Sequence, residues 1–206
     1  MTATLYYAHD PMCSWCWAFR PTWDHVCATL GEEIRISRLL GGLAPDSSEP
    51  MPQAMQDMLQ DTWRDIQLRV PTTVFNFDFW KNCEPRRSTY PACRAVIAAT
   101  RFGQELHEPM TRAIQRAYYL EARNLSDDST LVALAGELGL DKEEFSKALQ
   151  SEDVRDEFQQ QVAACHRLNI PGFPSLLVHK GGVIRRVPVE FNDPELQIRL
   201  IADATG

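Results

Sequence analysis

Two cysteines three positions apart, Cys13 and Cys16, are the residues of this sequence best suited to chemistry. They follow a short run of β-forming residues and stand where an apolar helical pattern begins. A helix N-terminus carries a positive dipole end and unpaired N–H groups, which favour a thiolate over a thiol. Because the thiolate is the nucleophile in disulfide chemistry, we expect Cys13 to attack. Cys16, one helical turn further in, would be shielded and would resolve the mixed disulfide.

A zinc site is the alternative for such a pair, and it needs two further ligands. The remaining candidate ligands show no second paired spacing: Cys27, Cys83, Cys93, Cys165 and His166. The sequence therefore favours redox chemistry and predicts no metal site. Cys27 and Cys165 are expected in the core. Cys83 and Cys93 are either unpaired thiols or a second, regulatory disulfide.

Residues at two further positions could take part in the reaction of the cysteine pair, by facing the ligand or by accepting a proton. The run Pro171–Gly172–Phe173–Pro174 precedes an expected strand, where a proline facing a ligand is a candidate for a cis peptide bond. An ordinary trans proline ending a loop is the alternative. Asp10 precedes the cysteines and is either a proton acceptor for the resolving thiol or a cap of the turn before Pro11.

The elements that must position these residues follow the order βαβ, a helical block, then ββα. Residues 4–8 and 33–40 are expected strands on either side of a helix at 13–31, which is a unit with a parallel strand pair. A period-two pattern predicts extended chain at 74–80. The remaining expected helices are 55–70, 91–101, 104–123, 129–138, 141–150, 151–165 and 193–203, and the remaining expected strands are 175–179 and 183–187.

Length and composition exclude several classes of protein. The chain has 206 residues, of which 44% are hydrophobic and 24% charged, as in an ordinary globular domain rather than a disordered chain or a coiled coil. A net charge of −7 gives nucleic-acid binding no electrostatic support. The N-terminus lacks the basic residues of a signal peptide, and no apolar run approaches the length of a membrane span. We therefore expect no membrane partner and a cytoplasmic location.

The segment Asp10–Trp17 (DPMCSWCW), taken with Gly172–Phe173–Pro174, resembles the DsbA-like thioredoxin superfamily. The most similar branch is that of cytoplasmic FrnE-like oxidoreductases, which are related to 2-hydroxychromene-2-carboxylate isomerases and kappa-class glutathione transferases. The resemblance extends over essentially the whole chain. It implies an α/β, thioredoxin-like fold with an inserted helical domain, in which residues 1–45 and 165–206 form the thioredoxin-like domain and residues 46–164 form the insertion.

The resemblance also implies roles for individual residues. Cys13 would be the nucleophile, Cys16 the resolving thiol, and Pro174 a cis proline whose neighbouring peptide group binds the substrate. Phe173 would occupy the position that tunes the active-site thiol. Ser14–Trp15, the exposed pair between the cysteines, would join Phe173 and Pro174 as the substrate-binding residues.

These observations predict a cytoplasmic thiol–disulfide oxidoreductase of the reductase or isomerase type, because the cytosol is reducing. Its partners would be disulfide-containing peptides, proteins or small thiols. No bound cofactor is expected, glutathione is the candidate co-substrate, and a homodimer is one alternative for the assembly. The alternative function is that of a glutathione-dependent isomerase or transferase acting on a small aromatic substrate. Cys13, where those branches usually carry serine, favours disulfide exchange.

Overall fold

A mixed sheet of four strands lies at the centre of the computed structural model, which describes residues 2–206. The strands are β1 (Ala3–His9), β2 (Ile34–Leu40), β3 (Ser175–Lys180) and β4 (Val183–Val187), in the order β2-β1-β3-β4. β1 pairs with β2 in parallel, and β3 runs antiparallel to both β1 and β4. β1 therefore has a hydrogen-bonded neighbour on each side, which holds its C-terminal end in place in the interior.

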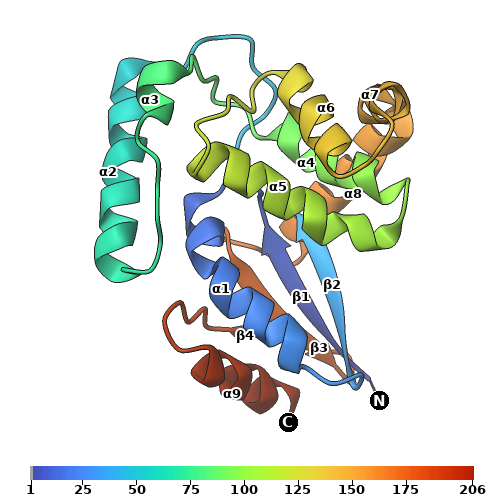
Figure 1. Ribbon diagram of the computed structural model, residues 1–206. Helices are drawn as coiled ribbons and strands as arrows, with labels where there is room; N and C mark the ends of the chain where they lie inside the picture. Colours follow the sequence, from blue (N-terminus) through green and yellow to red (C-terminus); the bar gives the residue numbers. More distant parts are fainter. Residues whose placement is uncertain (1) are drawn as a thin grey trace.

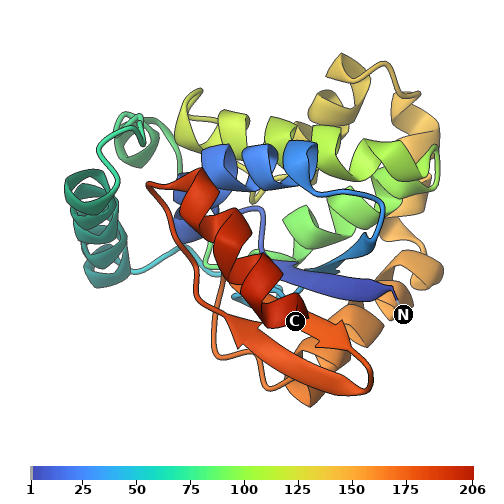
Figure 2. The same cartoon turned by 90° about the horizontal axis from the view of Figure 1, so that it is seen from below.

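Helices cover both faces of this sheet (Figures 1 and 2). α1 (Ser14–Thr29) and α9 (Pro194–Thr205) pack on one face, where Leu5 of β1 and Val178 of β3 meet Trp23 of α1 and Ile201 of α9. α8 (Glu152–Arg167) packs on the other face through Cys165. The predicted strand–helix–strand start and strand–strand–helix end are confirmed. The prediction of an α/β, thioredoxin-like fold is therefore confirmed.

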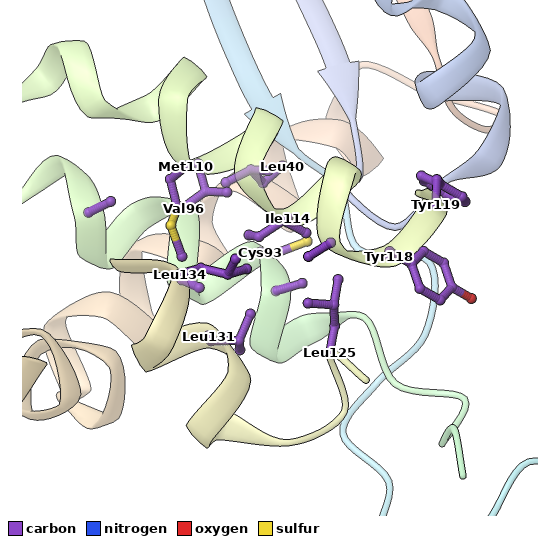
Figure 3. Close-up of a cluster of buried hydrophobic side chains, with 14 of the residues drawn as sticks. Leu40, Cys93, Val96, Met110, Ile114, Tyr118, Tyr119, Leu125, Leu131 and Leu134 are labelled. Carbon is purple, nitrogen blue, oxygen red and sulfur yellow. The ribbon is translucent and has the colours of Figure 1, made fainter. Parts of the chain in front are cut away.

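The helical block between β2 and β3 has its own core. Its elements are α2 (Gln53–Arg69), α3 (Phe79–Asn82), α4 (Tyr90–Thr100), the 3₁₀ turn η1 (Gln104–Leu106), α5 (His107–Tyr119), α6 (Asp128–Glu137), α7 (Lys142–Gln150) and most of α8. α4 is apolar on nearly all sides, as expected of a helix surrounded by others. Figure 3 shows Cys93 and Val96 of α4, Ile114 of α5 and Leu131 of α6 meeting in this core.

Two sequence predictions in this block are wrong. Residues 74–80 are not extended throughout: a loop and a turn over 74–78 lead into α3, which begins at Phe79, because Phe75 and Phe79 both pack against Trp63 of α2. The helix expected at 104–123 is divided into η1 and α5 and ends early, at Tyr119. Ala122 just beyond it has a φ of 52°, a left-handed conformation that cannot continue a helix.

The expected domain boundary at residues 164 and 165 falls inside α8. The first half of this helix places Val154 and Phe158 in the core of the helical block, while Cys165 near its end packs against the sheet. The division of the chain into two domains stays a prediction. In the structure α8 is a single helix that contacts both parts.

Candidate active site

Cys13 is the N-cap residue of α1, at the turn where the chain leaves β1. Its backbone is extended (φ −80°, ψ 118°), and its Sγ accepts a hydrogen bond from the backbone N–H of Cys16 at 3.4 Å. The side chain is buried except for 5% of its surface. The helix therefore directs an N–H group and the positive end of its dipole at this sulfur, as the sequence predicted.

The second contact of the sulfur comes from the opposite end of the chain. The Phe173–Pro174 peptide bond is cis, which confirms the expectation for Pro174. The Cys13 thiol donates a hydrogen bond to the Phe173 carbonyl at 3.3 Å. The Phe173 ring packs so closely over Gly41 that a methyl group there would overlap it. The Cys13 sulfur thus has one donor and one acceptor beside it, which suits both its thiolate and its thiol form.

Cys16 is fully buried one turn into α1. Burial raises the pKa of its thiol well above the ordinary value, and its hydrogen bond with Cys13 adds to the increase. The two motif cysteines are free thiols in this structure. Cys13 is therefore slightly exposed and Cys16 is inaccessible and protonated, while their roles as nucleophile and resolving thiol stay predictions.

Asp10 connects the turn before Cys13 to two distant segments through hydrogen bonds. Its buried carboxylate accepts hydrogen bonds from the N–H of Met12 (2.7 Å), the N–H of Leu43 (2.8 Å), the hydroxyl of Thr89 (2.6 Å) and the thiol of Cys93 (3.7 Å). Burial raises the pKa of Asp10, although these donors oppose the shift. The structure therefore gives Asp10 the turn-capping role, and proton transfer to it stays a prediction.

The helical block supports the same turn from the other side. The Tyr119 hydroxyl at the end of α5 donates to the Met12 carbonyl at 2.7 Å. The Tyr119 ring stacks on Trp17, whose indole N–H donates to the Val74 carbonyl at 3.0 Å. The sequence analysis missed Tyr119 and Thr89, because no local spacing links them to residues about a hundred positions away.

A groove of about 440 Å³ brings together three of the predicted substrate-binding residues, Trp15, Phe173 and Pro174. Cys13 is not among the lining residues in the described chain, but its thiol donates to the carbonyl of Phe173, which is one of them. Ser14, the first residue of α1, is half-buried and is not part of the groove lining in the described chain. Trp15 is half-buried rather than exposed, because Phe191 packs edge-on against it at 5.3 Å. The sequence analysis missed the remaining lining residues: Arg69, Val70, Val189, Glu190, Phe191 and Asn192.

The other four cysteines lie outside this site and are free thiols. Cys93 is buried against Asp10, and the thiol of Cys83 donates to the Ala122 carbonyl at 3.1 Å. Cys165 is buried as predicted, whereas Cys27 is only half-buried, beside Arg38. Among residues 2–206, no three histidine, cysteine or acidic side chains come together as a metal site would require.

A polar cluster lies beneath the motif, between β1, α1 and α5. The His9 ring is fully buried, stacks flat on Tyr7 at 4.7 Å and lies 5.5 Å from His107. Burial lowers the pKa of His9, and the neighbouring His107 adds to this effect. Glu108 accepts from Arg20 at 2.6 Å and from Arg38 at 2.5 Å, and these two charges hold its pKa at about 2 although burial opposes them.

Comparison with known proteins places these features in a family. A family model described as thioredoxin matches residues 6–184, a range that includes both cysteines and the cis proline. The chain belongs to the thioredoxin family. Proteins named as the oxidoreductase DsbA share its fold, so the fold that the DsbA-like resemblance implied is confirmed. Within residues 2–206, every helix of this family member is too short or too polar to cross a bilayer.

Two solved structures and one curated relative are similar over most of the chain. A candidate protein disulfide isomerase from Nitrosomonas europaea superimposes with a TM-score of 0.84 at 25% identity, covering 98% of this chain and 97% of its own. The cytosolic disulfide reductase DsbM from Pseudomonas aeruginosa gives 0.80 at 23% identity, covering 97% of each chain. The ClpXP adapter protein SpxH from Bacillus subtilis is 22% identical over 84% of this chain, which spans only 56% of SpxH.

Proposed function

We propose that this protein is a thiol–disulfide oxidoreductase of the reductase or isomerase type that acts in the cytoplasm. One observation carries the proposal: the sulfur of Cys13 lies between the N–H of Cys16 and the carbonyl of Phe173, with a buried thiol one turn away. In our proposal Cys13 is the attacking sulfur, Cys16 is the resolving sulfur, and the peptide group of Phe173 and Pro174 beside Cys13 binds the substrate. This arrangement is what a two-step disulfide exchange needs.

The exchange follows from these positions. The Cys13 thiolate attacks one sulfur of the substrate disulfide, the sulfur–sulfur bond breaks, and the other substrate sulfur leaves as a thiolate that takes a proton. Cys16 then loses its proton and attacks Cys13, which releases the second substrate thiol and leaves a Cys13–Cys16 disulfide. Two electrons pass from the protein to the substrate. The same steps in reverse oxidise a dithiol.

The burial of Cys16 makes the second step depend on proton removal. Because burial keeps the Cys16 thiol protonated, it does not compete with Cys13 for an incoming disulfide. Once the mixed disulfide forms, Cys16 must transfer its proton before it can attack. Asp10 remains our candidate acceptor for that proton, because its carboxylate is buried in the turn directly before Cys13 and burial raises its pKa.

The reducing poise of the cytosol supports a net reductase or isomerase rather than an oxidase. DsbM, which shares this fold, is described as a cytosolic disulfide reductase, and one of its structures contains glutathione. We therefore propose disulfide-containing peptides, proteins or small thiols as substrates and glutathione as the co-substrate. Trp15, Phe173 and Pro174 would contact the substrate in the groove, and Ser14 would do so at its edge.

Redox titration of the purified protein in a series of glutathione buffers tests the proposal. Mass analysis after alkylation should find one two-electron transition that forms the Cys13–Cys16 disulfide. Cys13→Ser should abolish disulfide reduction, and Cys16→Ser should accumulate a mixed disulfide through Cys13. Cys27→Ser, which alters a half-buried thiol on the same helix, is the control and should keep full turnover.

Two results would count against dithiol exchange. One is the absence of a Cys13–Cys16 disulfide at every glutathione ratio. The other is full turnover by Cys16→Ser, which would favour the glutathione-dependent isomerase or transferase instead, because that chemistry needs one reactive sulfur rather than two.

A further inference from the structure

Arg69, the last residue of α2, brings a positive charge into the groove that Trp15, Phe173 and Pro174 line. It lines the groove together with Phe173 and Pro174, and its guanidinium lies over the Trp15 ring, 5.8 Å from the ring centre. Cation–π contact of this kind favours one position of a long side chain. The backbone is held as well, because the Asn192 side chain donates to the Arg69 carbonyl at 3.1 Å.

The charge of Arg69 is available to a ligand. Its carboxylate partner in the structure is Asp65, one turn back on the same helix at 3.0 Å, and the two side chains are 67% and 46% exposed. An exposed pair of this type contributes little, so a better placed carboxylate can replace Asp65. The groove also contains the carboxylate of Glu190, whose Oε1 accepts from the N–H groups of Asn192 (2.7 Å) and Asp193 (3.2 Å), so two backbone donors oppose its negative charge.

Apolar side chains form part of the wall around Arg69. Val70, Val189 and Phe191 line the same groove, and Leu68 next to Arg69 is 81% exposed. A substrate could therefore bury apolar surface against these walls while a carboxylate reaches the guanidinium at their edge. Since the chain carries a net charge of −7, the surface elsewhere tends to repel anions, and a local cation gives an anionic substrate a preferred point of approach.

We propose that Arg69 is a specificity-determining residue that binds a carboxylate of the disulfide substrate. This inference rests on the proposed disulfide exchange and adds the substrate class: cysteine-containing chains with a carboxylate close to the reacting sulfur. Acidic peptides and glutathione share this chemistry. The residue comes from the helical block between β2 and β3, so that block provides the charge selection and α1 provides the reacting thiols.

Arg64 offers a matched control on the same helix. It also pairs with a carboxylate of its own helix, Asp61 at 2.7 Å, and it also lies over an aromatic ring, that of Phe77 at 5.4 Å. It lines a different surface hollow, formed with Trp80 and Lys81, which shares no lining residue with the groove at Arg69. Replacing Arg64 therefore removes the same charge and the same types of contact without changing the groove.

The test compares wild type, Arg69→Gln and Arg64→Gln on four disulfides. Two are peptide disulfides that differ only by Glu or Gln next to the cysteine; the others are glutathione disulfide and the uncharged hydroxyethyl disulfide. Arg69→Gln should lower kcat/KM for the Glu peptide about three- to tenfold, mainly through KM, and should leave the Gln peptide and hydroxyethyl disulfide within about twofold. Arg64→Gln should change none of them. The response of glutathione disulfide shows whether the small thiol shares the peptide's binding mode.

The outcomes separate this inference from the proposed function. An equal loss on all four substrates would indicate a structural role for Arg69, and no loss on the Glu peptide would mean that its charge is unused; either result overturns the inference. If the wild-type protein reduces none of the four disulfides, the proposed oxidoreductase function itself fails. Circular dichroism of both variants checks that they are folded.

Discussion

The buried histidines beneath the active site should make this protein sensitive to mild acid. His107 begins α5, and neither of its ring nitrogens has a hydrogen-bond partner in the described residues. Burial lowers the pKa of His107 to about 4; Glu108 opposes this shift, while Arg38 and Arg20 add to it. His9 lies 5.5 Å away, and burial lowers its pKa as well. Both rings are therefore neutral in the folded protein.

The effect of pH on stability follows from the lowered pKa of His107. An unfolded chain binds the histidine proton at the ordinary value of 6.5, and the folded protein binds it at about 4. Between these values the unfolded state holds more protons, so stability falls as the pH falls. For His107 alone the free energy of unfolding should decrease by about 2 kcal/mol from pH 7 to pH 5. His9 adds to the loss in the same direction.

Urea unfolding followed by circular dichroism, in the presence of a reductant, measures this loss at pH 7, 6 and 5. The variant His107→Leu removes the titrating ring, and its stability should decline by about 2 kcal/mol less than that of wild type over the same range. His107→Gln serves the same purpose if the leucine variant does not fold. His166→Gln, an exposed position on α8, is the control and should decline as wild type does. If wild type and His107→Leu lose stability in parallel, the buried-histidine account is wrong.

Two further substitutions test how the active-site turn is held. Gly41→Ala should force the Phe173 ring away from its position, lower the free energy of unfolding by about 1–3 kcal/mol in thermal unfolding and slow disulfide reduction. Gly172→Ala is the control, because Gly172 precedes Phe173 in the proline turn but has open space beside it. This variant should change the free energy of unfolding by less than about 0.5 kcal/mol. Asp10→Asn should cost about 1–3 kcal/mol in urea unfolding, because the amide presents a donor where the carboxylate accepts from backbone N–H groups. Asp61→Asn, at an ion pair in which both side chains are exposed, should cost less than about 1 kcal/mol, and an equal effect of the two would contradict the assigned role of Asp10.

The reactive pair could be located from the sequence because its signals are local. A strand of β-forming residues followed within a few positions by a helical pattern puts Cys13 at a helix N-terminus whatever the rest of the chain does. The turn before Pro174 was recognisable for the same reason, since prolines restrict the backbone of their own neighbours. The structure confirms both positions.

Residues 74–80 show where local patterns fail. Alternating phenylalanines indicate a strand only if a sheet edge is available beside them. Here the neighbour is Trp63, which stacks on Phe75 at 4.7 Å and lies 6.2 Å from Phe79. Burial of two aromatic rings against one indole outweighs the weak preference for extended chain, so the segment bends into a loop and the short helix α3.

The reactive residues of the site can therefore be predicted from the sequence, whereas the distant residues that contact them cannot. Cys13, Cys16 and the start of the helix that positions them lie within four consecutive residues. The acceptor for the Cys13 thiol comes from 160 residues away, Tyr119 reaches Met12 across 107 residues, and Arg69 enters the groove from the inserted block. Such contacts depend on how helices and sheet pack against one another. Packing energy is shared among many side chains, so no single spacing in the chain encodes it.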